Sequence, residues 1–118
     1  MTGKVERRKH PRIKDKNISV KLSGEGFHTI TQSLDVSASG IYCKVDRKIP
    51  LMTQIQLVLS IPSKGKSSTT LNVDGVVVRE HPVMVDGRVD YYDIAIFFNM
   101  LSQKEKQILV TYIENKAE

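Results

Sequence analysis

The stretch VDYYDIAIFF at residues 89–98, followed by SQKE at residues 102–105, decides the fold, because the hydrophobic period changes between them. SQKE has the form of a capping box, with Ser102 as N-cap and Glu105 as the third helical residue. We therefore predict a strand followed by a C-terminal helix. On the strand, one face carries Tyr92, Ile94, Ile96 and Phe98 at every second position. On the helix, the apolar stripe at helical spacing is Ile108, Leu109, Tyr112 and Ile113.

Alternation with a period of two also dominates the chain before this point. It predicts further strands at residues 17–22, 27–34, 41–46, 55–61 and 71–80, with turns at residues 24–26 and 86–87. The strands are too close in sequence for helical crossovers, so we expect an antiparallel sheet closed into a small barrel. The predicted fold class is all-β dominated: a six-stranded antiparallel β-barrel with one C-terminal α-helix laid over an opening or flank.

The apolar parity slips inside the strand at residues 71–80. Leu71 and Val73 belong to one face, whereas Val76 and Val78 follow in the opposite register. One extra residue flips the register of a strand, and glycine tolerates the required geometry. We therefore predict a β-bulge at Gly75.

Length and composition indicate an ordinary soluble protein. The 118 residues are 40% apolar and 26% charged, enough for one domain with a single modest core. The longest uninterrupted apolar run, residues 94–98, is far shorter than the roughly 20 residues that cross a bilayer. The first residues contain no apolar segment typical of a secretory signal, and Cys43 is a lone cysteine. We expect a cytoplasmic protein without membrane insertion.

The positive charge is concentrated at the N-terminus. Residues 1–16 hold seven Lys or Arg and two acidic residues, whereas residues 17–118 hold eleven of each kind. We therefore divide the single domain into a flexible basic arm, residues 1–16, and a neutral body that holds the barrel and helix, residues 17–118. A cationic arm indicates an anionic partner, although a solvated basic tail is the plain alternative.

The arm carries two arginines that can act on one ligand. Pro11 disfavours a helix here, and in an extended chain Arg8 and Arg12 share a side because they are four residues apart. Arg7 is out of that register and would need a bend to join them. Guanidinium groups bind phosphate, or the O6/N7 edge of guanine, in bidentate fashion. This segment is the first part of a candidate binding site.

The second part lies at the end of a predicted strand. Asp35 and Ser37 are two residues apart and project to one side, and Gly40 opens the next strand. A carboxylate accepts hydrogen bonds from N1–H and the amino group of guanine, which arginine cannot do. Ser37 can reach a phosphate or a backbone group, and Gly40 leaves room for a ring close to the backbone. An ordinary Asx or Ser turn is the plain alternative.

Together the two segments resemble the PilZ family of small β-barrel receptors for cyclic di-GMP. The family motif, Arg-x-x-x-Arg followed by Asp/Asn-x-Ser-x-x-Gly, is complete at residues 8–12 and 35–40. The resemblance covers roughly residues 6–113. One position departs from it: the last strand of family members often carries glycine where this chain has Ala95, and the added methyl group could reshape the ligand groove.

The resemblance implies a site of six residues for cyclic di-GMP. Arg8 and Arg12 hold guanine and phosphate with help from Arg7, Asp35 and Ser37 complete the site, and Gly40 permits close approach. The expected protein is a bacterial second-messenger receptor that passes its signal to an unidentified downstream protein. A ligand-independent protein adaptor of the same fold is the first alternative, and a small barrel that binds RNA or single-stranded DNA is the second.

Other chemistry finds little support in the sequence. No nucleophile with a base, pair of catalytic carboxylates or phosphate-binding glycine loop is visible, so we expect no enzyme and no cofactor. His10, His28 and His81 are scattered without metal-ligand spacing, so no metal site is expected. Cys43 is assigned to the core. Tyr91 and Phe97 lie opposite the core parity, and ordinary packing is preferred for them over a ligand or partner surface.

Overall fold

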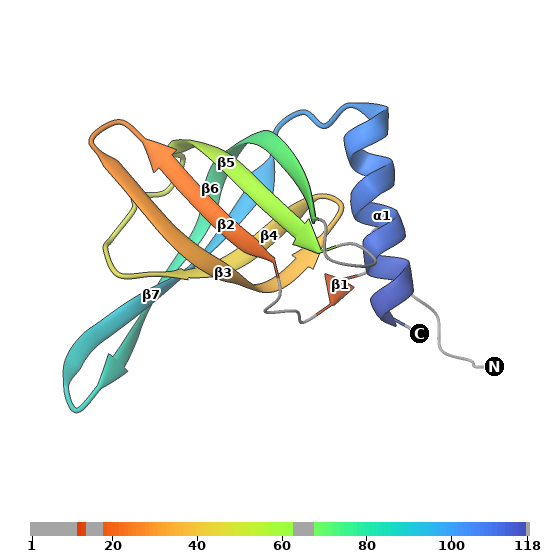
Figure 1. Cartoon of the computed structure of the whole chain (residues 1–118). Coiled ribbons are helices and arrows are strands. Elements are labelled where there is room, and N and C mark those ends of the chain that lie inside the picture. Colours follow the sequence, from red (N-terminus) through yellow and green to blue (C-terminus); the bar gives the residue numbers. More distant parts are fainter. Residues whose placement is uncertain (1–11, 14–17, 63–67, 118) are drawn as a thin grey trace.

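The computed structural model describes residues 12–13, 18–62 and 68–117. Six long antiparallel strands lie side by side in the order β3-β2-β5-β6-β7-β4, and β4 pairs again with β3, so the sheet closes into a ring (Figure 1). The predicted fold class is thus confirmed. The strands are β2 (Ser19–Gly24), β3 (Phe27–Ser37), β4 (Gly40–Val45), β5 (Gln54–Pro62), β6 (Ser68–Val85) and β7 (Arg88–Phe98). The two-residue β1 (Arg12–Ile13) adds to β3, and α1 (Gln103–Ala117) follows the sheet.

The interior of the ring is the hydrophobic core. On β5 the predicted alternation is reproduced, since Ile55, Leu57, Leu59 and Ile61 are buried while Gln56 is exposed. The predicted stripe of α1 joins the same core through Leu109, Tyr112 and Ile113. The helix stands beside the ring and contacts β1 and β3 (Figure 1). One face of every long element is therefore committed to the core.

The start of α1 is held by the predicted capping box. The backbone N–H of Glu105 donates to Oγ of Ser102 over 3.1 Å, and the backbone N–H of Ser102 donates to Oε1 of Glu105 over 3.0 Å. These bonds satisfy two donors that a helix N-terminus otherwise leaves without partners. No helix among the described residues has both the length and the apolar content needed to cross a membrane.

The register of β6 corrects one prediction. The pairing of β6 with β5 runs without interruption through Gly75, and the register shifts lie instead in the pairing with β7, between Val77 and Arg79 and between Val83 and Met84. Gly75 and Val77 thus continue the core face that Leu71 and Val73 begin, whereas Val78 is half exposed. The predicted bulge at Gly75 is wrong, and the nearest register shift lies about three residues further on, at Val78.

Strand β6 is also longer than predicted, because it continues past residue 80 to Val85. Its ladder with β5 ends at Val76, and among the described residues its strand partner beyond that point is β7, so the β6–β7 hairpin extends past the ring (Figure 1). Pro82, which cannot donate to a ladder, is tolerated because the hairpin strand has one edge that no described strand pairs with. The predicted turn is confirmed at Asp86 and Gly87, whose φ angles of 53° and 81° are both positive, as a tight hairpin turn requires.

Gly75 is a glycine because the core leaves no room for a methyl group. A Cβ atom there would lie 2.6 Å from Cγ2 of Ile96 and 3.0 Å from Cδ1 of Leu57. We expect Gly75→Ala to lower the free energy of unfolding by about 1–3 kcal/mol, the usual cost of overpacking. Urea unfolding followed by circular dichroism measures this. An unchanged midpoint would contradict the tight packing of β6 on β7.

The capping box provides a second test of the fold. Replacing Ser102 with alanine removes the acceptor for the N–H of Glu105, so we expect a loss of about 0.5–2 kcal/mol. Ser102→Asp keeps a capping oxygen and serves as the matched control, with stability close to the original. Equal midpoints for the alanine and aspartate variants in urea would argue against a capping role.

Candidate functional site

The pairing of β1 with β3 brings the two sequence motifs to one place. Arg12 lies opposite Ser37 and Ile13 opposite Val36 in an antiparallel register. The last arginine of the first motif is therefore joined by its backbone to the serine of the second. Arg7 and Arg8 lie outside the described residues, and the division of the chain at residue 16 stays a prediction.

Ser37 shapes the turn that links β3 to β4. Its side chain is buried, and its Oγ accepts a hydrogen bond from the backbone N–H of Ser39 over 3.2 Å. The same Oγ lies 3.1 Å from Oγ of Ser39 and 3.5 Å from the carbonyl oxygen of Gly40. This is the local serine turn that the sequence left open as an alternative. It holds the chain in place immediately after Asp35.

Gly40 is required by the approach of β4 to β7. It is paired with Phe97, and a Cβ atom at this position would lie 2.5 Å from the carbonyl oxygen of Ile96. A backbone oxygen cannot move aside as a side chain can, so the protein itself demands glycine here. The space beside Gly40, which the sequence assigns to a ligand, is thus occupied by the backbone of the neighbouring strand β7.

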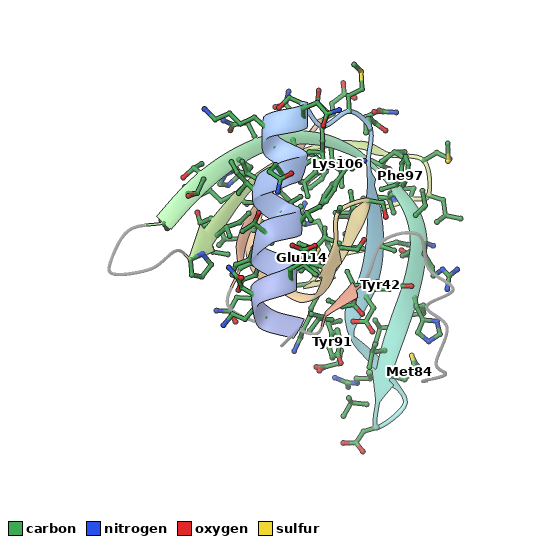
Figure 2. All side chains as sticks on the ribbon, turned by 90° about the vertical axis from the view of Figure 1, so that its right-hand side faces the viewer. Tyr42, Met84, Tyr91, Phe97, Lys106 and Glu114 are labelled. Carbon is green, nitrogen blue, oxygen red and sulfur yellow. The ribbon has the colours of Figure 1, made fainter. Side chains whose placement is uncertain are left out.

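A shallow groove of about 340 Å³ crosses the outer face of the sheet beside this turn. Strands β3, β4, β6 and β7 all contribute to its lining, which includes Asp35, Gly40, Tyr42, Arg79, Ala95 and Phe97. Figure 2 shows Phe97, Tyr42 and Tyr91 along this side of the molecule, with Met84 on the hairpin beyond them. Two sequence-predicted site residues, Asp35 and Gly40, therefore share one groove.

Four of these residues form a single row across the sheet. Asp35 pairs with Tyr42, Tyr42 pairs with Ala95, and Ala95 pairs with Arg79. Residues paired in this way project from the same face, so the row runs from a carboxylate to a guanidinium across four strands. With neighbouring strands about 4.8 Å apart, its ends are separated by roughly 14 Å. The groove offers an acceptor at one end and a donor at the other.

Sequence reasoning missed Tyr42 and Arg79 and undervalued Phe97. Phe97 is 49% exposed and lines the groove, so ordinary packing does not describe it. Tyr91 instead packs against a cation, because Nζ of Lys44 lies 4.2 Å from the centre of its ring. In the sequence only Ala95 marks this row, as the unusual residue of the last strand, and its register with Tyr42 is visible only in the folded sheet.

The remaining titratable groups do not form a second site among the described residues. His28 and His81 are exposed, and no three His, Cys, Asp or Glu side chains in this part of the chain are placed to hold a metal ion. The prediction of Cys43 as a core residue is confirmed, since it is fully buried. Burial, with a smaller effect of the Asp93 carboxylate, raises the pKa of its thiol to about 12, so this cysteine is a poor nucleophile at neutral pH.

Comparison with known proteins places this fold among described domains. A family model described as PilZ domain matches residues 6–115. The curated proteins include no sequence that matches the chain. Solved structures do match it, although at sequence identities that show a shared fold and no more.

Three of these structures illustrate the likeness. The Bacillus subtilis inhibitor of motility, MotI/DgrA, has a TM-score of 0.81 at 16% identity, over 96% of this chain and 52% of that one. The K. pneumonia MrkH–c-di-GMP complex has a TM-score of 0.74 at 15% identity, over 96% and 53%. The PilZ domain with c-di-GMP of YcgR from Escherichia coli has a TM-score of 0.66 at 14% identity, over 95% of each chain. The present chain spans about half the length of the first two.

The close approach of Gly40 to Ile96 predicts that the folded sheet itself requires glycine at position 40. We expect Gly40→Ala to destabilise the fold by about 1–3 kcal/mol, because the new methyl group meets a backbone oxygen. The measurement is thermal and urea unfolding without any ligand. A variant as stable as the original protein would show that glycine is not needed by the sheet, and would leave a ligand as the reason for it.

Proposed function

The chain belongs to the PilZ domain family, and from this membership we propose that it is a receptor for cyclic di-GMP rather than an enzyme. The observation that carries the proposal is the register of β1 on β3, which sets Arg12 opposite Ser37. That register supports a site in which the basic arm and the Asp35 groove act on one ligand. The folds of MrkH and YcgR, both solved with c-di-GMP, support the same choice of ligand.

The groove suits one part of a guanine nucleotide and the arm suits another. Asp35 is half-buried and lines the groove, where its carboxylate would accept from N1–H and the amino group of guanine. Arg7, Arg8 and Arg12 would supply the donors for phosphate and for the O6/N7 edge. Ser37 and Gly40 would act through the turn and the close strand approach that they maintain.

The downstream step in this proposal is a change in the arm that a partner protein detects. Ordering about five arm residues over the nucleotide costs roughly 1–2 kcal/mol per residue, which the charge-assisted hydrogen bonds offset. Ligand would thus shift the population of arm conformations, and a partner that distinguishes them would receive the signal.

A second candidate function is a protein adaptor that needs no ligand. It is favoured by the apolar tip of the β6–β7 hairpin, where Met84 is 54% exposed and Val85 50% exposed. Apolar side chains on a projecting hairpin are typical of a protein contact surface. The two functions make opposite predictions about nucleotide binding.

Isothermal titration with cyclic di-GMP distinguishes them. We expect a dissociation constant on the order of micromolar or below, because four or five charge-assisted hydrogen bonds and base stacking exceed the cost of ordering the arm. Affinity falls as salt is raised, since ions screen the arginines.

The variants Arg8→Ala, Arg12→Ala and Asp35→Asn should each weaken binding by roughly 10- to 100-fold, the equivalent of one charged contact. Arg88→Ala removes the same charge from the start of β7, outside the groove, and should bind as the original protein does. Absence of heat at tens of micromolar ligand would reject the receptor function and leave the adaptor.

A further inference from the structure

We propose that Arg79 is a ligand-contacting residue of the nucleotide site, serving the nucleotide half that lies away from Asp35. This inference rests on the proposed function and adds to it a residue that belongs to neither sequence motif. Arg79 lines the groove on its β6 side, across the sheet from Asp35. Three features of the structure support the assignment.

The first feature is the bulge in β6. Val77 pairs with Ile96 and Arg79 pairs with Ala95, so Val78 is the extra residue between them. In a regular strand, successive side chains face opposite sides, but Val78 and Arg79 are both exposed and both line the groove. The bulge therefore delivers a guanidinium to the outer face without disturbing Val77 in the core.

The second feature is the state of the Arg79 side chain. It is exposed, and within the described part of the chain it forms no ion pair. Its distance of about 14 Å from Asp35 along the row, three strand spacings, rules out a direct pair between the two. An arginine in this position is available to an incoming acceptor.

The third feature is the floor of the groove between the two ends. Ala95 separates Tyr42 from Arg79 with a single methyl group, and Phe97 presents an exposed aromatic face one step along the same strand face. A small residue leaves space for a planar ring, and a guanidinium plane can stack on that ring or bind its O6/N7 edge. The row thus fits a ligand with two separated recognition groups, which cyclic di-GMP has in its two guanines.

The test is isothermal titration of the full chain with cyclic di-GMP at one fixed salt concentration. We expect Arg79→Ala to weaken binding by roughly 10- to 100-fold, the loss of one charged or stacking contact. Arg79→Lys keeps the positive charge but lacks the planar guanidinium group. On a logarithmic scale of the dissociation constant, it should recover less than half of the affinity that Arg79→Ala loses. Arg88→Ala, on the same hairpin but outside the groove, should stay within twofold of the original protein.

A nuclear magnetic resonance titration provides a direct readout of contact. The side-chain N–H resonance of Arg79, assigned by its absence in Arg79→Ala, should shift on addition of cyclic di-GMP, whereas that of Arg88 should not. Unfolding midpoints equal to the original confirm that the variants are folded, as expected for an exposed side chain.

The outcomes separate this inference from the receptor function. Undiminished binding by Arg79→Ala, together with weak binding by Arg12→Ala and Asp35→Asn, would overturn the role of Arg79 and leave the receptor intact. Full recovery of affinity in Arg79→Lys would overturn the planar contact. An original protein that binds no cyclic di-GMP would overturn both proposals together.

Discussion

The pairing of β4 with two partners is the interaction on which the rest of the structure depends. This six-residue strand lies between β7 and β3, and its hydrogen bonds close the sheet into a ring. Closure removes two sheet edges and encloses the core. It also sets Gly40 against the carbonyl oxygen of Ile96 and aligns Asp35, Tyr42, Ala95 and Arg79 across the outer face.

The two faces of these strands perform different tasks because side chains alternate. The row Val36, Ile41, Ile96 and Val77 is buried in the core. Its first three residues each adjoin a residue of the row that forms the groove, whereas Val77 is separated from Arg79 by the bulged Val78. A shift of one residue in any pairing would exchange the two rows, so core packing also enforces the geometry of the outer face. The core packing thus fixes which side chains the sheet presents in the groove, although the groove itself lies on the outer face.

Both ends of the groove row lie next to register shifts. One shift lies between Ser33 and Asp35 in the pairing of β3 with β4, and the other between Val77 and Arg79 in the pairing of β6 with β7. Bulges interrupt a ladder and re-aim side chains, and they are common near functional sites. Among the described residues, one carboxylate, that of Asp35, and one guanidinium, that of Arg79, line the groove, and each lies next to one of these bulges.

The amino-acid sequence alone determined the strand alternation, the hairpin turn at Asp86 and Gly87, and the capping box of α1, because each depends on neighbours within a few residues. The motif residues Asp35 and Gly40 could be selected for the same reason. The tertiary structure alone decided where β6 bulges and which residues stand beside Asp35. Tyr42, Ala95 and Arg79 lie far apart along the chain, and only the register of four strands, imposed by closure of the sheet, brings them into one row.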